Sequence, residues 1–431
     1  MSDSRRSFIQ KFGGLLGLTL SSPFYQTLQG QDLVSTIAKY QNTGLEEVVR
    51  DETFWYQIKQ AYTVSPSILN FNNGGVCPAP KVVQDALDRY NKLSNEAPSF
   101  YMWRILDQGR EPLRRKLAQL ASCHQDEIAI NRNASEALET IIFGLALKAG
   151  DEVVLSRQDY PNMTHAWRQR ELRDGIVLKW VDLQYPIEDD EQIVKAYQAL
   201  FSEKTKVVHL THVINWNGQI LPVQKIGRLA HQQGIEVVVD GAHSFTHIPY
   251  RLDEMECDYF GTSLHKWLCA PIGSGMMYIK KKKIAKVFPL FGASDPLSDN
   301  IRKFENLGTR SFPIEQAIGQ AIDFHYLIGG ERKAERLFYL KNYWVERVME
   351  HPKISVHTSL KKGYSGAIAL INCAGKTAPE FSHALQSKYK IHTTQSNWGG
   401  IVGVRISPNV YTTTRDLDIL VDSILEIADQ A

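Results

Sequence analysis

Short β-branched runs alternate with segments of helical periodicity through the middle of this chain, and this alternation most constrains its fold. The runs predict strands over 153–155, 176–178, 207–210, 235–239 and 275–279. Apolar residues at helical spacing lie between them, over 162–173, 190–201 and 223–233. Strands and helices in alternation predict a largely parallel sheet with helices on both faces. Such sheets bind ligands at the carboxyl ends of their strands, so the chemistry is expected there.

The pattern changes after about residue 313. Two long helices are expected over 314–327 and 331–349, then short strands near 367–371 and 403–406 and a last helix over 415–428. This is typical of a second, smaller α+β domain. We therefore predict a signal over 1–30, an N-terminal helical arm over 31–67, a large domain over 68–312 and a small domain over 313–431.

Composition excludes several classes of protein. With 43% hydrophobic and 22% charged residues in 431, the chain is neither disordered nor collagen-like. The 49 lysines and arginines against 47 acidic residues leave a net charge of +2, which gives no support to a nucleic-acid partner. The five cysteines are scattered and form no CxxC pair, so we expect free thiols.

The N-terminus has the layout of an export signal. Arg5 and Arg6 precede the apolar stretch 12–20, which is followed by the small residues Ser21 and Ser22. The paired arginines resemble the twin-arginine motif, which implies the twin-arginine export machinery as a partner and the bacterial periplasm as the location. An amphipathic N-terminal helix in a cytoplasmic protein is the alternative. The apolar stretch is shorter than the roughly 20 residues of a membrane span.

Lys266 is the residue most suggestive of chemistry. It lies in a hydroxyl-rich loop, 261–267, that follows the apolar pair Tyr259-Phe260. A lysine removed from water loses proton affinity and can form a Schiff base with an aldehyde. Taken alone, a loop lysine is more often a surface residue.

Two further features change that balance. Asp240 ends the most hydrophobic predicted strand, where a buried carboxylate needs a cation such as a pyridinium nitrogen. Asn133 begins a helix with small residues in its first turn, and such a helix start favours a phosphate. Lysine, strand-end aspartate and helix start together match the three attachments of pyridoxal 5'-phosphate: carbon, ring nitrogen and phosphate.

The segments Asn133-Ala134-Ser135, Asp240-Gly241-Ala242-His243 and Ser263-Leu264-His265-Lys266 resemble those of class V aminotransferase-fold enzymes. This family includes cysteine desulfurases and isopenicillin N epimerase-like proteins, and the resemblance runs from about Ile68 to the end. It implies the α/β fold of type I pyridoxal-phosphate enzymes. It also implies catalytic roles for Lys266, Asp240 and His243. The implied cofactor contacts are Ala134, Ser135, Ser263 and His265 at the phosphate, Asn215 at the 3'-oxygen, His243 near the ring hydroxyl and Tyr160 stacked on the ring.

The same resemblance implies how substrate and subunits meet. Arg405 matches the position that binds the substrate α-carboxylate, for which an arginine fork is suited; an exposed ion-paired arginine is the alternative. Asn73 and Phe100 belong to segments that resemble the substrate side of the epimerase-like branch. Thr309 lies in a loop that resembles the one reaching the neighbouring subunit's phosphate, which implies a homodimer with shared active sites.

Other chemistries find less support. Desulfurases carry a nucleophilic cysteine shortly before the carboxylate-binding arginine, whereas the segment 391–400 has none, so persulfide formation is not expected. We predict no metal site: His243 and His247 are four apart but lie beside a strand end and Pro249. No HExxH or Walker motif occurs in the sequence.

The predicted function is therefore a pyridoxal-phosphate enzyme that removes the α-proton of an amino acid. Epimerisation and transamination stay open as equal alternatives, and a C–S lyase is the third. A non-catalytic exported binding module of the same fold is the rival from another class, because a fold alone does not secure a function.

Overall fold

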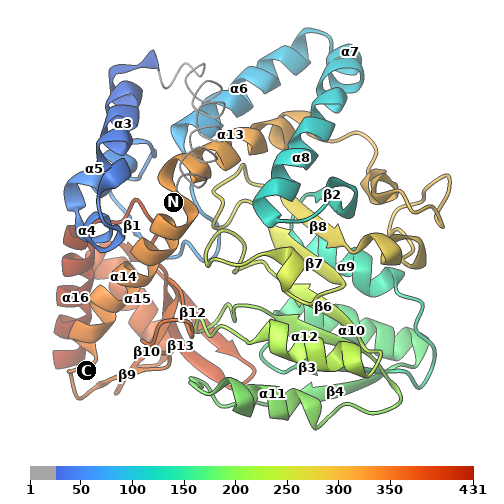
Figure 1. Cartoon of the computed structure of the whole chain (residues 1–431). Coiled ribbons are helices and arrows are strands. Elements are labelled where there is room, and N and C mark those ends of the chain that lie inside the picture. The colour runs from blue at the N-terminus through green and yellow to red at the C-terminus, as the bar shows by residue number, and fades with distance from the viewer. Residues whose placement is uncertain (1–25) are drawn as a thin grey trace.

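The computed structural model describes residues 26–431, and Figure 1 shows two unequal sheets, each packed against helices. The predicted signal lies almost wholly in residues 1–25, outside the described part. Among the described residues, no helix is long and apolar enough to cross a membrane.

A seven-stranded sheet forms the centre of the larger part, in the order β2-β8-β7-β6-β5-β3-β4. Its strands are β2 (Ile128–Asn131), β3 (Glu152–Ser156), β4 (Val177–Val181), β5 (Thr205–Thr211), β6 (Glu236–Asp240), β7 (Tyr259–Ser263) and β8 (Gly275–Ile279). The β8 strand runs antiparallel to both of its neighbours, and the other pairs are parallel. The expectation of a largely parallel sheet is confirmed.

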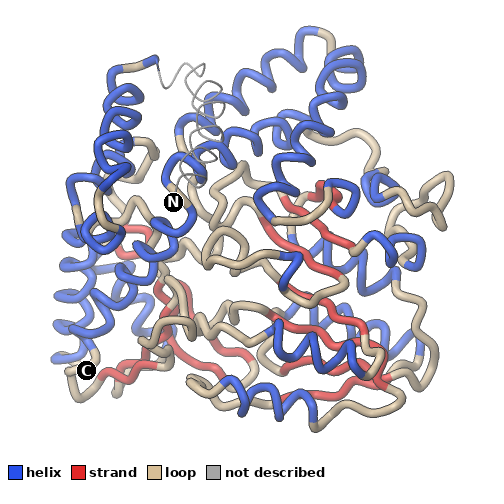
Figure 2. The backbone as a smooth tube through the Cα atoms, viewed as in Figure 1, coloured by secondary structure: helices blue, strands red, loops and turns tan. Residues whose placement is uncertain are grey.

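Alternate residues of these strands pack into two different cores, because successive side chains of a strand point to opposite faces. Val238 packs with α9 (Ala134–Gly144) and α10 (Pro161–Asp174) on one face. Val237 and Val239 pack on the other face with α6 (Lys81–Glu96), α8 (Arg110–Ala121), α12 (Val223–Gln232) and α13 (Phe312–Ile328). Helices therefore cover both faces of the sheet, and Figure 2 shows these helices in blue and the strands in red. The helices of this part are α6 (Lys81–Glu96), α7 (Pro98–Phe100), α8 (Arg110–Ala121), α9 (Ala134–Gly144), α10 (Pro161–Asp174), α11 (Asp190–Gln198) and α12 (Val223–Gln232).

A four-stranded antiparallel sheet, β12-β13-β10-β9, forms the smaller part and packs against helices with its own core. Its strands are β9 (Ile354–Val356), β10 (Ala369–Cys373), β12 (Thr394–Trp398) and β13 (Ile401–Ile406). The C-terminal helices are α13 (Phe312–Ile328), α14 (Gly330–Val348), α15 (Ala378–Tyr389) and α16 (Thr414–Asp429). The strands and helices expected after residue 313 are thus present.

Three sets of contacts tie the parts of the chain together. β1 (Leu69–Asn70) pairs in parallel with β11 (Ile391–His392), although more than 300 residues of sequence separate them. The N-terminal arm contains α3 (Leu28–Lys39), α4 (Leu45–Arg50) and α5 (Glu52–Gln60), and α4 packs on α14. The α13 helix packs on α6 and α8 of the larger part, as Figure 1 shows. The domain boundary at 312/313 stays a prediction.

Candidate active site

The Lys266 amine lies close to two other predicted site residues. Lys266 follows β7 by three residues, and its side chain is half-buried. Its Nζ lies 2.8 Å from His243 Nε2 and 6.0 Å from the centroid of the Tyr160 ring. Burial lowers the pKa of Lys266 to about 8, helped by the Arg405 charge and opposed by the Asp240 charge. About a tenth of this amine is therefore neutral, hence nucleophilic, at pH 7, far more than for an exposed lysine.

His243 is buried just beyond the end of β6 and faces the lysine. Burial, together with the nearby charges of Lys266 and Arg405, holds its pKa well below the usual range. The ring is therefore neutral in the site, and its Nδ1 is buried without a hydrogen-bond partner. Buried polar atoms normally have a hydrogen-bond partner, so this ring nitrogen is available to a polar group of a ligand.

Asp240 is the last residue of β6 and is buried at the carboxyl end of the sheet, as the sequence predicted. Its Oδ1 accepts the Ala242 N–H at 2.9 Å. Burial raises the pKa of Asp240, while the Ala242 amide and the Lys266 charge lower it in part. Among residues 26–431, no lysine or arginine forms an ion pair with this carboxylate, so a bound cation would supply a missing partner.

The start of α9 meets the end of β7 as a phosphate site requires. The side chain of Asn133 caps the helix by accepting the Glu136 N–H at 2.8 Å, and the Ala134 N–H donates to Ser263 Oγ at 2.9 Å. Ser135 is half-buried in the first turn. Gly275 of β8 permits this approach, because a Cβ there would lie 2.6 Å from the Asn133 backbone. His265 is half-buried beside this junction, with Nδ1 3.0 Å from the Ser274 carbonyl oxygen.

Arg405 is buried, which removes the alternative of an exposed ion-paired arginine. Its Nη1 donates to the Asn215 carbonyl at 2.9 Å and its Nη2 to Asn72 Oδ1 at 2.7 Å. Burial lowers the pKa of Arg405 to about 10. No carboxylate of the described residues pairs with it, and its Nε is buried without a partner. A buried guanidinium without a counter-ion is a strong site for a carboxylate ligand.

Two predicted substrate residues lie differently from the rest. The Asn73 amide is fully used inside the chain: it donates to Ser407 O at 2.9 Å and accepts the Tyr411 hydroxyl at 2.6 Å. Its neighbour Asn72 is the one that contacts Arg405, and the substrate role of Asn73 stays a prediction. Phe100 ends the short helix α7 and is 53% exposed, with Tyr101 as its aromatic contact. The structure does not bring it to Lys266 within this chain.

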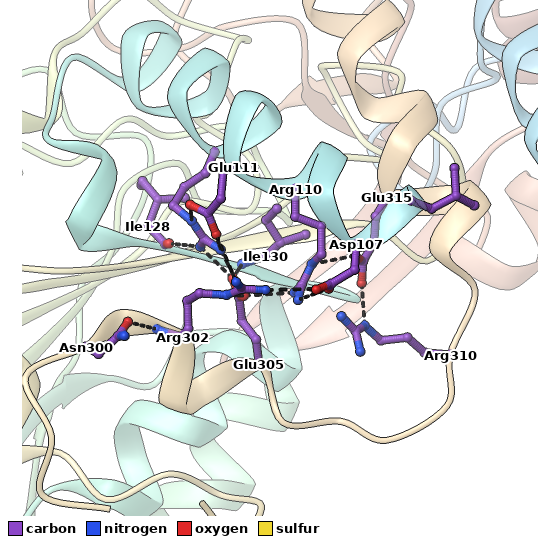
Figure 3. A network of polar contacts seen from close by, with 12 residues as sticks. Asp107, Arg110, Glu111, Ile128, Ile130, Asn300, Arg302, Glu305, Arg310 and Glu315 are labelled. Atoms are coloured by element: carbon purple, nitrogen blue, oxygen red, sulfur yellow. Dashed lines mark hydrogen bonds and ion pairs between the residues drawn. The ribbon is translucent and has the colours of Figure 1, made fainter. Parts of the chain in front are cut away.

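Thr309 is exposed on a loop whose two ends are held by buried ion pairs, drawn in Figure 3. Glu305 pairs with Arg110 at 2.9 Å and Arg114 at 2.6 Å, and Glu315 pairs with Arg310 at 2.6 Å. Burial raises the pKa of Glu305, but the Arg114 and Arg110 charges outweigh it, so its pKa is lowered. The loop between Glu305 and Glu315 is therefore fixed at the surface, beside a cavity of about 590 Å³.

Comparisons with known proteins bear on the family and the fold. The family model described as aminotransferase class V matches residues 68–420. The chain belongs to this family. An isopenicillin N epimerase of Amycolatopsis lactamdurans is 25% identical over 87% of the chain and 99% of the relative. A probable cysteine desulfurase of Synechocystis is 27% identical over 73% and 79%. A cysteine desulfurase structure from Thermococcus onnurineus has a TM-score of 0.78 at 20% identity, over 87% of this class V chain and 98% of the other.

The residues present fit pyridoxal 5'-phosphate, the cofactor of this family. The test rests on buried polar atoms that lack partners within the described chain: His243 Nδ1, Asn215 Oδ1 and Arg405 Nε. His243 contacts the Lys266 amine, and Arg405 contacts the Asn215 carbonyl. Lys266 would hold the aldehyde carbon, Asp240 the ring nitrogen and Asn215 the ring oxygen. The phosphate would be held by Ala134, Ser135, Ser263 and His265.

Sequence reasoning missed two residues that the structure places in the site. Asn72 was passed over for Asn73, because no local signal tells which amide of the pair faces Arg405. Asp159, the neighbour of Tyr160, is not among the predicted site residues, yet it is completely buried. The strand-end argument that found Asp240 also finds Asp159, since it follows β3 by three residues.

Proposed function

We propose that the chain is a pyridoxal-phosphate enzyme that epimerises an amino acid at Cα, with transamination as the second candidate. The observation that carries the proposal is the lowered pKa of Lys266 beside the charges of a buried aspartate and a buried arginine, neither of which has a counter-ion among residues 26–431. The isopenicillin N epimerase relatives, matched over nearly their full length, support epimerisation over transamination. When bound, the cofactor would withdraw electrons from Cα and so acidify its hydrogen.

Each residue then has a defined task. Arg405 binds the substrate carboxylate, held in position by Asn72 and the Asn215 carbonyl. Lys266 Nζ, when neutral, accepts the Cα proton, and His243 keeps the amine oriented at 2.8 Å without competing for the charge. Asp240 holds a proton on the ring nitrogen by its negative charge. Tyr160 covers one side of the site with its ring.

We propose further that the chain does not form a persulfide. The β12–β13 hairpin that contains Arg405 carries no cysteine, and Trp398 at the end of β12 donates an N–H to the Asp159 carbonyl at 3.0 Å. Cys373 is buried on β10, and burial raises the pKa of its thiol. A raised pKa disfavours the thiolate that sulfur abstraction needs.

The decisive experiment follows the α-hydrogen. Purified protein with added cofactor is incubated in D2O with L- and D-amino acids, and the Cα–H signal is followed by NMR and the enantiomers by chiral chromatography. We expect Cα deuteration with inversion in the wild type and none in Lys266→Ala. Formation of a 2-oxo acid without inversion identifies the aminotransferase, and release of sulfide or pyruvate identifies the lyase. No exchange with any amino acid supports the binding module.

The cofactor itself is tested by spectroscopy. We expect a yellow protein whose visible band is fixed by borohydride, with the reduced adduct mapping to Lys266. A colourless protein that takes up no added pyridoxal phosphate contradicts the proposal.

We also propose twin-arginine export, supported by the sequence order at residues 1–22. Replacing Arg5 and Arg6 with lysines should retain the protein in the cytoplasm, measured by fractionation of expressing cells. Unchanged periplasmic yield contradicts export by this route.

A further inference from the structure

A second carboxyl group lies buried beside the aspartate of the site. Asp159 follows β3, and Asp240 ends β6; the strand between them is β5. Thr211 ends β5 directly opposite Asp240 in the register of the two strands. The three residues therefore lie at the same carboxyl edge of the sheet, and Thr211 stands between the two acids.

Both oxygens of Asp159 are held by hydrogen bonds. The Oδ2 atom accepts the Ser156 N–H at 2.8 Å, and Oδ1 accepts the Thr211 hydroxyl at 2.6 Å. The side chain is fully buried. Because each carboxyl oxygen accepts a hydrogen bond, the plane of the carboxyl group is fixed and faces Thr211.

No cation balances Asp159 among the residues that the structure describes. The titratable groups that face it are Asp240 from β6, Tyr197 from α11 and Tyr185 from the loop after β4. Burial raises the pKa of Asp159 to about 7; its two hydrogen bonds lower it in part, and Asp240 raises it further. Two buried carboxyls that interact do not both ionise readily, so the pair retains a proton near neutral pH.

We propose that Asp159 is a positioning residue for the cofactor, which ionises when the site is loaded and reinforces Asp240 in holding the protonated pyridine ring. The inference rests on the proposed function. The physical reason is that a ring cation at Asp240 supplies the positive charge that Asp159 lacks, which favours its ionised form. Loading therefore releases one proton from Asp159 whenever that carboxyl was protonated beforehand.

The sign of the pH dependence follows from this coupling. Asp159 has one pKa without cofactor and a lower one with cofactor bound. At a pH below both values the carboxyl is neutral in both states, and it contributes nothing to cofactor affinity. Above about pH 7 it is ionised in both states and attracts the ring cation. Compared with a neutral side chain, Asp159 should therefore strengthen binding only as the pH rises through its titration.

The test measures cofactor affinity rather than turnover. In a Lys266→Ala background, which removes the titrating amine, the Kd of pyridoxal 5'-phosphate is measured from pH 5.5 to 8.5 by quenching of tryptophan fluorescence. We expect Asp159→Asn to bind about tenfold more weakly at pH 8, the equivalent of one pKa unit, and equally well at the acid end. Asp182→Asn is the matched control, because it removes a carboxylate from an exposed site nearby.

A second variant guards against misfolding of the first. Thr211→Val keeps the carboxyl but removes its hydroxyl donor, so the affinity gain should begin at a higher pH than in the parent. Equal Kd values for Asp159→Asn, Thr211→Val and Asp182→Asn at every pH overturn the inference. That result is distinct from failure of the proposed function, in which the protein with Lys266 intact takes up no cofactor at all.

Discussion

At the scale of single residues, the site is defined by charges that the chain does not neutralise. Lys266, Asp240 and Arg405 each lie without an ion-pair partner in the described residues, although buried charges are normally paired. Such an arrangement costs stability in the empty protein. It is explained when a ligand with a ring cation and a substrate with a carboxylate supply the missing charges.

The role of Arg405 can be tested by a change that keeps its charge. In Arg405→Lys the ammonium cannot reproduce the fork that contacts the Asn215 carbonyl, Asn72 and a bidentate carboxylate. We expect KM for the amino acid to rise about tenfold or more, with a smaller change in kcat, measured by steady-state kinetics. The exposed Arg157→Lys is the control. An unchanged KM in Arg405→Lys would argue against carboxylate binding at this position.

At the scale of secondary-structure elements, the phosphate site depends on how closely α9 approaches β8. Small residues make this approach possible, since a Cβ at Gly275 would meet Asn133 and a Cβ at Gly261 would lie 2.6 Å from Leu138. Asn133 caps the helix start locally, and these two glycines let the sheet hold that start in close contact.

Gly275→Ala tests this dependence. The new methyl group should displace the start of α9, which costs about 1–3 kcal/mol of unfolding free energy and weakens pyridoxal-phosphate binding. Denaturant unfolding and fluorescence titration measure the two effects. Gly319→Ala in α13 is the control, since nothing lies within 4 Å of its Cβ position and helix propensity should stabilise it by up to about 1 kcal/mol. Full affinity in Gly275→Ala would refute the close-approach argument.

At the scale of the whole molecule, we propose a homodimer in which each subunit completes the other's site. Thr309 is exposed on its anchored loop, and the adjoining cavity is lined by Trp103, which is 45% exposed. An exposed aromatic residue beside a rigid polar loop is typical of an interface. The exposed Phe100 belongs to the same segment of chain as Trp103.

Mixed dimers test this arrangement. Lys266→Ala should be inactive because it lacks the amine. Thr309→Glu should be inactive because the new carboxylate repels the cofactor's phosphate. When the two are unfolded and refolded together, half-and-half dimers contain one intact site, so about a quarter of wild-type activity should return. Activity is measured by α-deuteration. A mixture as inactive as its components would place Thr309 in its own subunit's site or outside both.

Much of the fold could be predicted because its signals are local. The alternation of β-branched runs and helical periodicity located β3, β5, β6 and β8 closely, since burial on both faces makes these strands continuously apolar. The chemistry of Lys266 and Asp240 was equally visible, because Asp240 ends a strand and Lys266 follows one by three residues. What local signals could not show was which side chains meet across the sheet edge.

The sequence by itself therefore determined most of the element order, the strand-end Asp240 and the reactive lysine, because periodicity and residue type act over a few neighbouring positions. Only the tertiary structure decided that Asn72 rather than Asn73 contacts Arg405. It also decided that Asp159 accepts a hydrogen bond from Thr211, the residue opposite Asp240 in the sheet. Those pairings depend on register between strands and on segments hundreds of residues apart. Packing of the whole chain fixes these pairings, and no local sequence pattern encodes them.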